Sequence, residues 1–535
     1  MLGLGMLAPA GAEARTLHVR GGSDLAAVER ASRPGDRIIV HAAPTVYTGS
    51  IRLQPRQRLI GRGHPRLANP DGDVVTRARG TTVRGLRIVA AGRGGIYGRF
   101  RAKRGSLGRV TIRGNEVSGH NANCVPGFLI PPFAVPTTAP GVGVPISDGL
   151  QNGWAGIMVD AERGTPRITI RDNRVHDSDC GDGIDIRASG EARVRATITG
   201  NRLRDLREGS SLESVLAIGL QSAGHARLVA RLDRNRQAGL GNDEDAGAGP
   251  SGADSEGIFL NPVDHGHLRA TVSQNTYTHT PGRGGFSANG LEFVSMGDGA
   301  RGVVAIRDSS FSGPPGDVIE QLALGTNARL SLMLRRVVAR DSTGFAGSGM
   351  GNTVLIPGNN GDCVIGASGG AGNRVALSVR DSTLTGCANN GLTFGSSVAN
   401  GSGPTVELRL DVSGSVITGN RGNNLRIGNV SGLDALAVKV QGTDLGDAHG
   451  TGSTTPANAS FEDLGSTAES VIDLGGGSLG STGGNCLDGG TLGAALVRYD
   501  VTARGNWWGG PPTSTAVGGA LDADSALATA PERCA

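Results

Sequence analysis

Aromatic residues, lysine and long apolar runs are scarce in this chain of 535 residues. It has 3 Trp, 4 Tyr and 10 Phe, and Lys103 and Lys439 are the only lysines among its 52 basic residues. No stretch reaches the roughly 18 consecutive apolar residues of a membrane-spanning helix, and the apolar heptads of a coiled coil are missing. The arginines are spread along the sequence without interleaved aromatic residues, which argues against a nucleic-acid groove and is typical of a GC-rich genome. We therefore expect no membrane span and no nucleic-acid partner.

Glycine, in contrast, is abundant, with 90 residues, or about one position in six against roughly 7% in ordinary domains. Collagen is excluded because the glycines follow no Gly-X-Y period. General disorder is excluded because short alternating runs of Val, Ile and Leu recur throughout the chain. The glycine content therefore indicates an ordered architecture with many chain corners.

The first fourteen residues are apolar and end in the small-x-small sequence Ala12-Glu13-Ala14. Such a segment is typical of the end of a secretory signal peptide, so residues 1–14 are predicted to be a signal-peptide remnant. The cysteines contain no C-x-x-C spacing of a metal or redox site, and they fit an oxidising compartment. We expect a secreted, periplasmic or cell-surface protein.

The chain contains six cysteines, which allow fifteen pairings that the sequence alone does not fix. Proximity along the sequence favours three disulfides. The favoured pairs are Cys363 with Cys387 and Cys486 with Cys534, which leaves Cys124 for Cys180.

A degenerate repeat runs through the chain, with the template apolar-x-apolar-x-x-Asn/Ser/Thr-x-apolar. Its small polar position is occupied by Asn115, Asn173, Asn201, Asn235, Asn275, Ser309, Ser382, Ser415 and Thr443. An Asn at a turn can satisfy backbone groups and tolerate a left-handed φ, and stacked on its counterpart in the next repeat it can form a ladder.

A second template, a small or Asn/Asp turn followed by apolar-x-apolar, interleaves with the first. Its first apolar residues are Ile96, Ile157, Ile184, Ile218, Ile258, Leu291, Ile319, Leu355, Leu392 and Leu425. Successive copies are mostly 27 to 40 residues apart and contain two or three short strands without a helical pattern. Such units bury their apolar faces only by stacking, so the sequence predicts a solenoid of parallel strands.

The repeat resembles that of the right-handed parallel β-helix superfamily, which includes pectate lyases, polygalacturonases and secreted bacterial β-helix repeat proteins. The segment Asn506-Trp507-Trp508-Gly509 is similar to a closing motif of such proteins. Residues 23–31 are similar to the short capped helix that precedes their first coils. The resemblance implies an all-β, single-stranded right-handed parallel β-helix of about 11 to 13 coils with an N-terminal capping helix.

The predicted β-helix spans residues 15–512 as one domain. Residues 121–153 interrupt the repeat with an apolar, proline-rich stretch and are predicted to be an insertion loop. This loop serves either as a wall over one face of the rod or as a flap over exposed core. Residues 513–535 are predicted to be a C-terminal tail.

The residue between the two inward apolar positions of the second template should point outward onto one exposed sheet. That row reads Tyr97, Met158, Asp185, Gly219, Phe259, Glu292, Glu320, Ile356, Thr393 and Arg426. Glu292 and Glu320 fall on neighbouring coils, close enough to share a proton or a cation. Asp185 lies three coils away, with Asp182 in the turn before its strand. Paired carboxylates could cleave a glycosidic bond, and the alternative is a row of solvated surface acids.

Asp182 and Asp185 belong to the segment 178–186, which is superficially similar to the Gly-Asp-Asp-Cys segment of polygalacturonases, although the other motifs of that family are missing. His265, in the segment 264–267, is a candidate for acid–base or metal chemistry, with an exposed polar turn as the alternative. The sequence has no phosphate loop, dinucleotide fingerprint or zinc motif. A Ca²⁺ ion is the one cofactor left open, because pectate-lyase-like elimination requires a cation.

The candidate catalytic residues are therefore Asp182, Asp185, Glu292, Glu320 and His265. The resemblance implies a secreted, monomeric protein that binds or processes extracellular polysaccharide or cell-surface glycan. If it is an enzyme, we expect a polysaccharide lyase or a glycoside hydrolase. The absence of a complete catalytic motif leaves open a non-catalytic surface or adhesin-like β-helix.

Overall fold

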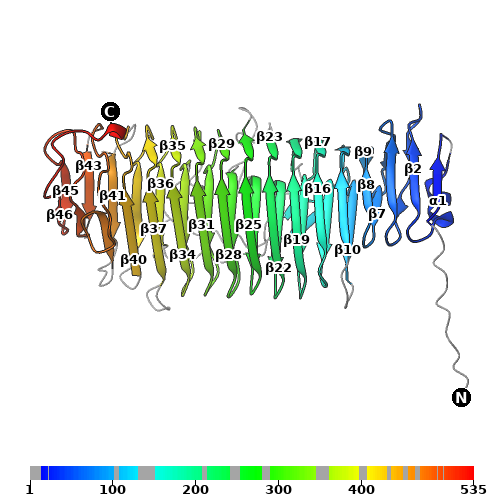
Figure 1. Cartoon of the computed structure of the whole chain (residues 1–535), viewed down its shortest axis with the longest axis horizontal. Helices are drawn as coiled ribbons and strands as arrows, with labels where there is room; N and C mark the ends of the chain where they lie inside the picture. The colour runs from blue at the N-terminus through cyan, green and yellow to red at the C-terminus, as the bar shows by residue number, and fades with distance from the viewer. Residues whose placement is uncertain are drawn as a thin grey trace, which may run out of the picture.

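The computed structural model describes most of the chain as a rod of parallel strands (Figure 1). The described residues are 14–21, 23–101, 108–129, 151–207, 214–240, 254–279, 289–344, 361–396, 406–430, 435–449, 456–463, 470–490, 492–497 and 499–534. In this part of the chain no helix has the length and hydrophobicity that crossing a membrane requires.

Three sheets, here named A, B and C, run along the rod. The strands of sheet A are β1 (Thr16–Val19), β2 (Arg37–His41), β5 (Arg58–Arg62), β8 (Thr82–Arg84), β11 (Arg109–Arg113), β16 (Arg167–Arg171), β19 (Arg193–Thr199), β22 (Arg227–Asp233), β25 (His267–Ser273), β28 (Arg301–Arg307), β31 (Arg329–Arg335), β34 (Arg374–Arg380), β37 (Glu407–Ser413), β40 (Ala435–Gln441), β42 (Val471–Gly475), β44 (Val501–Ala503) and β46 (Leu521–Asp522). The strands of sheet B are β3 (Tyr47–Thr48), β6 (Arg66–Asn69), β9 (Arg87–Ala91), β12 (Glu116–Ser118), β17 (Arg174–Ser178), β20 (Arg202–Leu206), β23 (Arg236–Leu240), β26 (Thr276–Thr278), β29 (Ser310–Ser312), β32 (Val338–Arg340), β35 (Thr383–Thr385) and β38 (Val416–Thr418). The strands of sheet C are β4 (Ile51–Arg52), β7 (Val75–Arg77), β10 (Ile96–Phe100), β13 (Pro126–Leu129), β14 (Gln151–Gly153), β15 (Ile157–Ala161), β18 (Ile184–Ala188), β21 (Ser214–Ala223), β24 (Asp254–Val263), β27 (Asn289–Ser295), β30 (Ile319–Ala323), β33 (Val364–Ser368), β36 (Leu392–Ser396), β39 (Leu425–Val430), β41 (Ala457–Asp463), β43 (Leu492–Val497) and β45 (Ser514–Val517).

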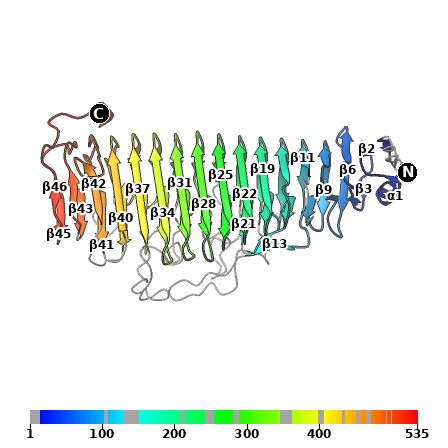
Figure 2. The same cartoon turned by 60° about the horizontal axis from the view of Figure 1, so that its bottom comes forward.

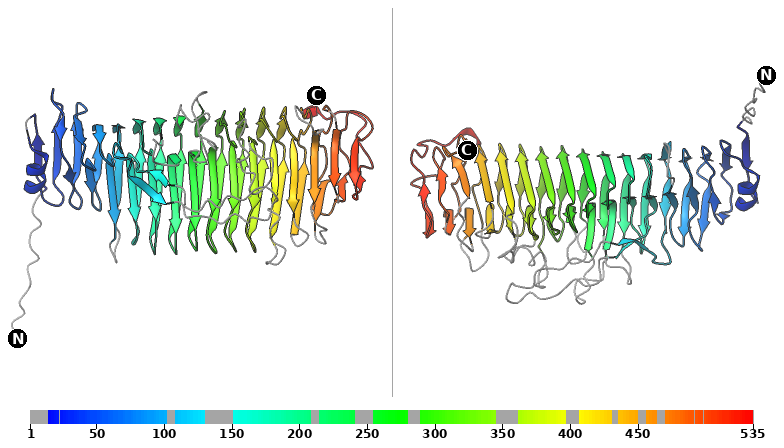
Figure 3. Two further views of the ribbon diagram at one scale, coloured as in Figure 1. Left: turned by 180° about the vertical axis from the view of Figure 1, so that it is seen from behind. Right: turned by 90° about the horizontal axis from the view of Figure 1, so that it is seen from below.

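The chain passes repeatedly from sheet C to sheet A to sheet B, and each strand pairs in parallel with the equivalent strand of the next coil. Strands of successive coils therefore lie side by side along the rod, as Figure 2 and the rear and lower views of Figure 3 show. This is the predicted right-handed parallel β-helix. In the described residues sheet B has 12 strands, whereas sheet A has 17, because the last coils contribute strands to sheets A and C but none to sheet B. The rod therefore has more coils than the predicted range of about 11 to 13.

The first repeat template forms the inward face of sheet A. Ile112 lies opposite Ile170, Ile170 opposite Ile198 and Ile198 opposite Leu232, and the same register continues to Val440. These side chains are fully buried in one continuous core of mainly Val, Ile, Leu and Ala. The narrow space between three flat sheets explains why the core uses few aromatic residues.

The small polar residues of this template form the predicted ladder. The backbone N–H of Asn115 donates to Oδ1 of Asn173 at 3.0 Å, and the same bond recurs from Asn173 to Asn201 and from Asn201 to Asn235. The side-chain amides of these residues also donate to the next Asn, at 2.9–3.0 Å. Because all four side chains are buried, each ladder bond satisfies polar groups that would otherwise lack partners.

The second template forms the inward face of sheet C, with one exception. From Ile96 through Ile319 the predicted residues lie opposite one another in register. The next inward position is held by Val364, which lies opposite Ile319 and Leu392, in place of the predicted Leu355. Leu355 and Ile356 themselves lie outside the described residues.

Helix α1 (Leu25–Ala31) is present at the N-terminal end of the rod, as predicted (Figure 1). The Asp24 side chain caps it by accepting the backbone N–H groups of Ala26 and Ala27, and Leu25 joins the core. That the helix seals the end of the core stays a prediction, and residues 1–13 lie outside the described part of the chain.

Residues 513–535 differ from the predicted tail. Strand β45 pairs with β43 in sheet C, and β46 pairs with β44 in sheet A, so the coil continues past residue 512. The 3-10 helix η1 (Glu532–Cys534) follows, and its Cys534 is bonded to Cys486. The strands escaped prediction because they are only two to four residues long and carry few large apolar side chains.

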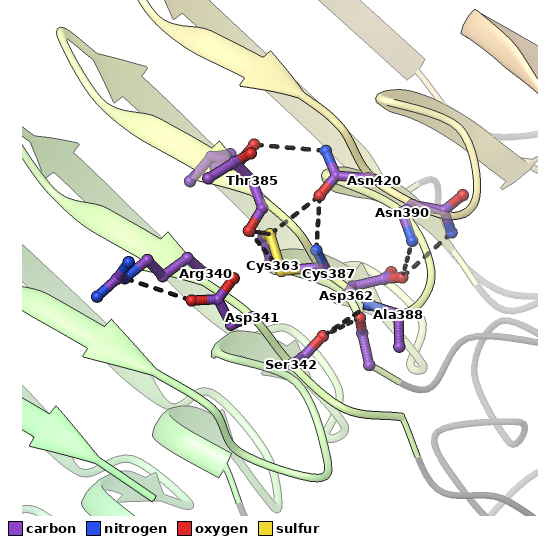
Figure 4. Close-up of a disulfide and its surroundings, with 12 residues drawn as sticks. Arg340, Asp341, Ser342, Asp362, Cys363, Thr385, Cys387, Ala388, Asn390 and Asn420 are labelled. Atoms are coloured by element: carbon purple, nitrogen blue, oxygen red, sulfur yellow. Dashed lines mark hydrogen bonds and ion pairs between the residues drawn. A yellow bond between two sulfur atoms is a disulfide. The ribbon is translucent and has the colours of Figure 1, made fainter. Parts of the chain in front are cut away.

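All three predicted disulfides are present. They join Cys124 to Cys180, Cys363 to Cys387 and Cys486 to Cys534. Around the second one, Oδ1 of Asn420 accepts the backbone N–H of Cys387 at 3.0 Å and lies 3.4 Å from Sγ of Cys363 (Figure 4). The disulfides therefore lie at the corners of the coil, where they tie turns to neighbouring strands.

The interruption predicted at residues 121–153 is visible at both of its described ends. Strands β13 and β14 pair antiparallel, unlike the coil strands, and Asn152 of β14 then pairs in parallel with Ser214 of β21. Residues 130–150 lie outside the described part of the chain.

Candidate functional site

The predicted outward row lies on sheet C. In the structure it consists of Tyr97, Met158, Asp185, Gly219, Phe259, Glu292, Glu320, Ile365, Thr393 and Arg426, each directly opposite the next. The row is therefore the predicted one, with Ile365 in place of Ile356. Glu292 lies directly opposite Glu320 on the neighbouring strand, as predicted.

The expectation that this row is exposed to solvent is wrong. Asp185 is 0% exposed, Glu320 is 2% exposed and Glu292 is 8% exposed. The outer face of sheet C carries a second apolar cluster, separate from the core of the coil, that includes Met158, Phe259, Val294, Met296, Leu322 and Ile365. The carboxyl groups therefore lie in a buried, largely apolar environment, where an ionised acid is costly.

A second polar row lies at the start of the strands of sheet C, two residues before each inward apolar residue. It includes Asp182, Glu256, Asn289, Asp317, Asp362 and Asn390, all nearly fully buried. Most of these side chains accept a backbone N–H of the next coil. Oδ1 of Asp182 accepts from Leu216 at 2.9 Å, for example, and Oδ1 of Asn289 accepts from Asp317 at 2.7 Å. This row is a second ladder, parallel to that of sheet A.

The two rows bring Asp182 and Asp185 together. Their carboxyl groups are hydrogen-bonded to each other, and the Asn152 amide donates to Oδ2 of Asp182 and, at 3.4 Å, to Oδ2 of Asp185. Burial raises the pKa of Asp182 to about 7, although the bonds from Asn152 and Leu216 oppose this shift. Burial and the charge of Asp182 raise the pKa of Asp185 well above its ordinary value. The pair therefore retains a proton near neutral pH.

The turn that follows β12 supports this aspartate pair. His120 donates to the backbone carbonyl of Asp182 at 2.6 Å, and the Asn121 amide donates to the carbonyl of Cys180. The Cys124–Cys180 disulfide holds the same two turns together. Burial lowers the pKa of His120 to about 4, so its imidazole is neutral and acts here as a hydrogen-bond donor.

Three glutamates form a separate group further along sheet C. One amide nitrogen, Nδ2 of Asn289, donates to Oε1 of Glu256 at 3.3 Å and to Oε2 of Glu320 at 2.8 Å. Because both oxygens bind the same nitrogen, they are at most about 6 Å apart. Glu292 lies beside Glu320 on the preceding strand. The sequence singled out Glu292 and Glu320, but the bridging role of Asn289 emerges only from the fold.

Asp317 and Asp362, which the sequence analysis missed, continue the strand-start row. Oδ1 of Asp317 accepts the backbone N–H of Asp362 at 2.7 Å, and Oδ1 of Asp362 accepts that of Asn390 at 2.8 Å (Figure 4). Burial, followed by the charge of Asp317, raises the pKa of Asp362 to about 7, against hydrogen bonds from Thr393 and Asn390. The signal that could have found them is their position, two residues before an inward apolar residue.

His265 does not join the carboxyl groups. It lies exposed in the turn after β24, at the opposite end of that strand from Glu256, and stacks on His225 with a centroid distance of 5.3 Å. The described part of the chain contains no group of three or more His, Cys, Asp or Glu that could hold a metal ion. The involvement of Ca²⁺ stays a prediction.

Chemically, the outer face of sheet C offers protonated carboxyl groups near neutral pH and a pair of glutamates joined by one amide. Such groups suit general acid–base and nucleophilic chemistry on a sugar polymer. Elimination also needs a base close to an acidic carbon. Arg187, two residues after Asp185 on β18, lies opposite Asp160 and Gln221 on the neighbouring strands.

Comparison with known proteins supports no assignment to a family, since no family model and no curated protein matches the chain. Among solved structures, the A-module of the Azotobacter vinelandii mannuronan C-5 epimerase AlgE4 is 12% identical over 82% of this chain and 88% of its own, with a TM-score of 0.35. The catalytic unit of an alpha-1,3-glucanase from Streptomyces thermodiastaticus is 11% identical over 76% of this chain and 69% of its own, with a TM-score of 0.35. The A-module of the A. vinelandii mannuronan C-5 epimerase AlgE6 is 12% identical over 92% of both chains, with a TM-score of 0.34. These likenesses carry no statement about the activity of this chain.

Proposed function

We propose that this protein cleaves an extracellular polysaccharide at the glutamates of sheet C, by the chemistry of a retaining glycoside hydrolase. The observation that carries the proposal is the Asn289 amide, whose nitrogen binds one carboxyl oxygen of Glu256 at 3.3 Å and one of Glu320 at 2.8 Å, so that these two oxygens are at most about 6 Å apart. Retaining hydrolases place their two carboxyl groups about 5–5.5 Å apart, whereas inverting ones need about 6.5–9.5 Å to admit a water molecule.

In this mechanism one carboxyl group donates its proton to the glycosidic oxygen while the other attacks the anomeric carbon as a carboxylate. A glycosyl ester forms as the bond to the leaving sugar breaks. The first group, now a carboxylate, then takes a proton from water, which hydrolyses the ester and restores both groups. Asn289 orients the two carboxyl groups, and Glu292 lies beside Glu320 on the neighbouring strand.

The burial of these acids fits the need for a general acid. A carboxyl group in an apolar site keeps its proton near neutral pH, as the Asp182–Asp185 pair on the same face does. Because the glutamates are buried, the proposal includes a local opening of the outer face of sheet C that admits the polymer.

A second candidate function is a non-catalytic surface protein, and the strand-start row favours it. Asp182, Asp317 and Asp362 each accept a backbone N–H of the next coil, so their carboxyl groups serve the fold. We assign these three aspartates to the fold and keep Glu256 and Glu320 for catalysis. For either function, the three disulfides fit a location outside the cytoplasm, where the environment is oxidising.

The proposal is tested by incubating the purified full-length protein with acidic and neutral polysaccharides, with and without Ca²⁺. New reducing ends measure hydrolysis, and ultraviolet-absorbing unsaturated ends measure elimination. We expect reducing ends without unsaturated ends, and a rate at least about 100-fold lower in Glu320→Gln and Glu256→Gln. The exposed Glu191→Gln is the control that keeps full activity.

Three results would overturn the proposal. One is no turnover of any polymer, which leaves the non-catalytic function. Another is turnover that produces unsaturated ends, which replaces hydrolysis with elimination. The third is full activity of the folded Glu320→Gln variant.

A further inference from the structure

The arginines that are spread along the sequence gather on the outer face of sheet A. Eight consecutive strands of this sheet, β11 through β34, contain fifteen arginines and a single acid, Asp233. All of these arginines occupy outward positions, because the inward positions of the same strands hold buried apolar residues. We name the outward side of these eight strands the arginine face.

The register aligns these arginines into rows along the rod. The longest row consists of Arg193, Arg227, His267, Arg301, Arg329 and Arg374, each directly opposite the next. Neighbouring strands are about 4.8 Å apart, so this row places five arginines over six coils. His267, between Arg227 and Arg301, interrupts the charge, because burial and these two arginines lower the pKa of its imidazole. A second row, of Arg109, Arg167 and Arg195, begins two coils closer to the N-terminus.

Most of the long row lacks acidic partners. Arg374 pairs with Glu407 at 2.9 Å, at the C-terminal end of the row. Among the described residues, Arg193, Arg227, Arg301 and Arg329 form no ion pair, and Asp233 is already engaged by Arg231 and Arg234. Like charges placed opposite one another in a sheet are destabilising. The electrostatic repulsion among these four arginines is therefore not offset by acidic side chains of the described residues.

The same face is hollowed at its N-terminal end. A cavity of about 410 Å³ is lined by Arg37, Arg62, Arg84, Arg113 and Arg171, among other residues, and by one acid, Asp172, which pairs with Arg171 at 3.5 Å. Burial, followed by the charges of Arg113 and Arg37, lowers the pKa of the Arg84 guanidinium. Arg84, Arg113 and Arg171 lie opposite one another and form a third row on sheet A.

We infer that the arginine face binds a linear polysaccharide with a carboxylate on each sugar residue, lying along the rod. One sugar residue extends about as far as one strand spacing, so the carboxylates of such a polymer match the arginine rows. Arginine, with its planar fork, suits bidentate pairing with a carboxylate, and the chain uses it almost to the exclusion of lysine. The face belongs to sheet A, so the inference is independent of the catalysis proposed on sheet C.

A nucleic acid fits this surface less well. Single-stranded nucleic acid is bound through base stacking on aromatic side chains, and the eight strands contain no Phe, Tyr or Trp. The flat sheet also lacks the helix or ribbon that enters the groove of a duplex. The arginine face therefore matches the polysaccharide with a carboxylate on each sugar residue (a polyuronate) better than it matches a nucleic acid.

The test measures equilibrium binding of oligogalacturonate chains of about eight residues, long enough to follow the eight strands. We expect Arg227→Gln/Arg301→Gln/Arg329→Gln to bind at least about tenfold more weakly than the wild type, with a smaller dependence on salt. The matched control, Arg174→Gln/Arg202→Gln/Arg236→Gln, removes the same charge from an exposed row on sheet B. It should stay within about twofold of the wild type.

Two further readouts complete the test. The sheet A variant should melt at the same temperature as the wild type or higher, because it removes uncompensated repulsion. The inference is overturned if both triple variants lose affinity equally, since net charge alone then governs binding. It is also overturned if single-stranded DNA or dextran sulfate of equal charge binds as tightly as the oligogalacturonate, or if the wild type binds none.

Discussion

At the residue scale, the buried acids of sheet C divide into two kinds. Asp182, Asp317 and Asp362 accept backbone N–H groups from the next coil, and burial raises the pKa of Asp182 and of Asp362 to about 7. Glu256 and Glu320, in contrast, converge on the side chain of Asn289. A carboxyl group retained in such a site at the expense of stability is typical of a functional position.

The raised pKa values predict that the protein loses stability as the pH rises. An acid with a pKa of about 7 when folded and about 4 when unfolded holds more protons in the folded state between these values, so the free energy of unfolding falls from about pH 4 to pH 7. We expect a lower melting temperature at pH 8 than at pH 5. Asp185→Asn should reduce this difference, because a neutral amide replaces one of the paired acids.

Melting curves recorded by circular dichroism at both pH values check this prediction. The exposed Asp179→Asn serves as the control and should melt like the wild type at each pH. A wild type that melts at a higher temperature at pH 8 than at pH 5 would show that the pair is ionised in the folded state.

Features of single residues were predictable where the spacing of residues along the sequence determines them. The three disulfides follow from cysteine spacing, and the pairing of Glu292 with Glu320 follows from the repeat. The burial of those glutamates could not be predicted, because an outward position in a strand does not reveal what packs on it. Asp317 escaped notice because its role depends on a backbone group of the next coil.

At the scale of the element, the coil is held together by ladders as well as by its core. Asn201 is fully buried, accepts the backbone N–H of Asn173 at 3.0 Å and donates to the carbonyl of Ile170 at 3.1 Å. Further along the same ladder serine takes over, and Oγ of Ser309 accepts the backbone N–H of Asn275 at 3.2 Å. A hydroxyl group therefore replaces an amide at this position at modest cost.

Substitutions of Asn201 are expected to follow this chemistry. Asn201→Ala leaves the N–H of Asn173 buried without its acceptor, which should lower the free energy of unfolding by about 1–3 kcal/mol. Asn201→Ser should lose less, because its hydroxyl can accept the same bond. Urea unfolding compares both with Thr197→Ala, an exposed position on β19, the strand that precedes Asn201. Equal losses in the Ala and Ser variants would contradict a ladder role.

The elements themselves were predictable to the extent that their spacing is regular. The register holds from Ile96 to Ile319 and is then displaced, because Val364 rather than Leu355 continues the inward row of sheet C. A long interval between two copies of the repeat offers several apolar pairs, and periodicity alone does not select among them. The short strands β45 and β46 were missed for a related reason, since they carry too few apolar residues to show a pattern.

At the scale of the whole molecule, the coil brings arginines that are far apart in the sequence onto one positively charged surface. Arg227, Arg301 and Arg329 are 28 to 102 residues apart in sequence, yet they belong to one row of sheet A. The arginines that are spread along the sequence therefore lie together in three dimensions, still without interleaved aromatic residues. Spacing along the chain did not predict this, because a coil brings together residues that are one repeat apart.

This surface predicts an unusual response to salt. Repulsion among exposed charges is screened as the Debye length falls from about 30 Å at 0.01 M to about 8 Å at 0.15 M ionic strength. We expect the melting temperature of the wild type to rise over this range, and to rise less in Arg227→Gln/Arg301→Gln/Arg329→Gln. Differential scanning calorimetry checks this, and a melting temperature that falls with salt would mean that attractive ion pairs dominate.

We propose that the two glutamates joined by Asn289 cleave a glycosidic bond. Proton nuclear magnetic resonance of the first sugar product, recorded on the polymer that the wild type hydrolyses fastest, tests this proposal. One oxygen of Glu256 and one of Glu320 bind the same amide nitrogen, so we expect the short carboxyl spacing of a retaining enzyme and a product that first appears with the anomeric configuration of the substrate. A product of inverted configuration, or no sugar product from any polymer, would contradict the claim.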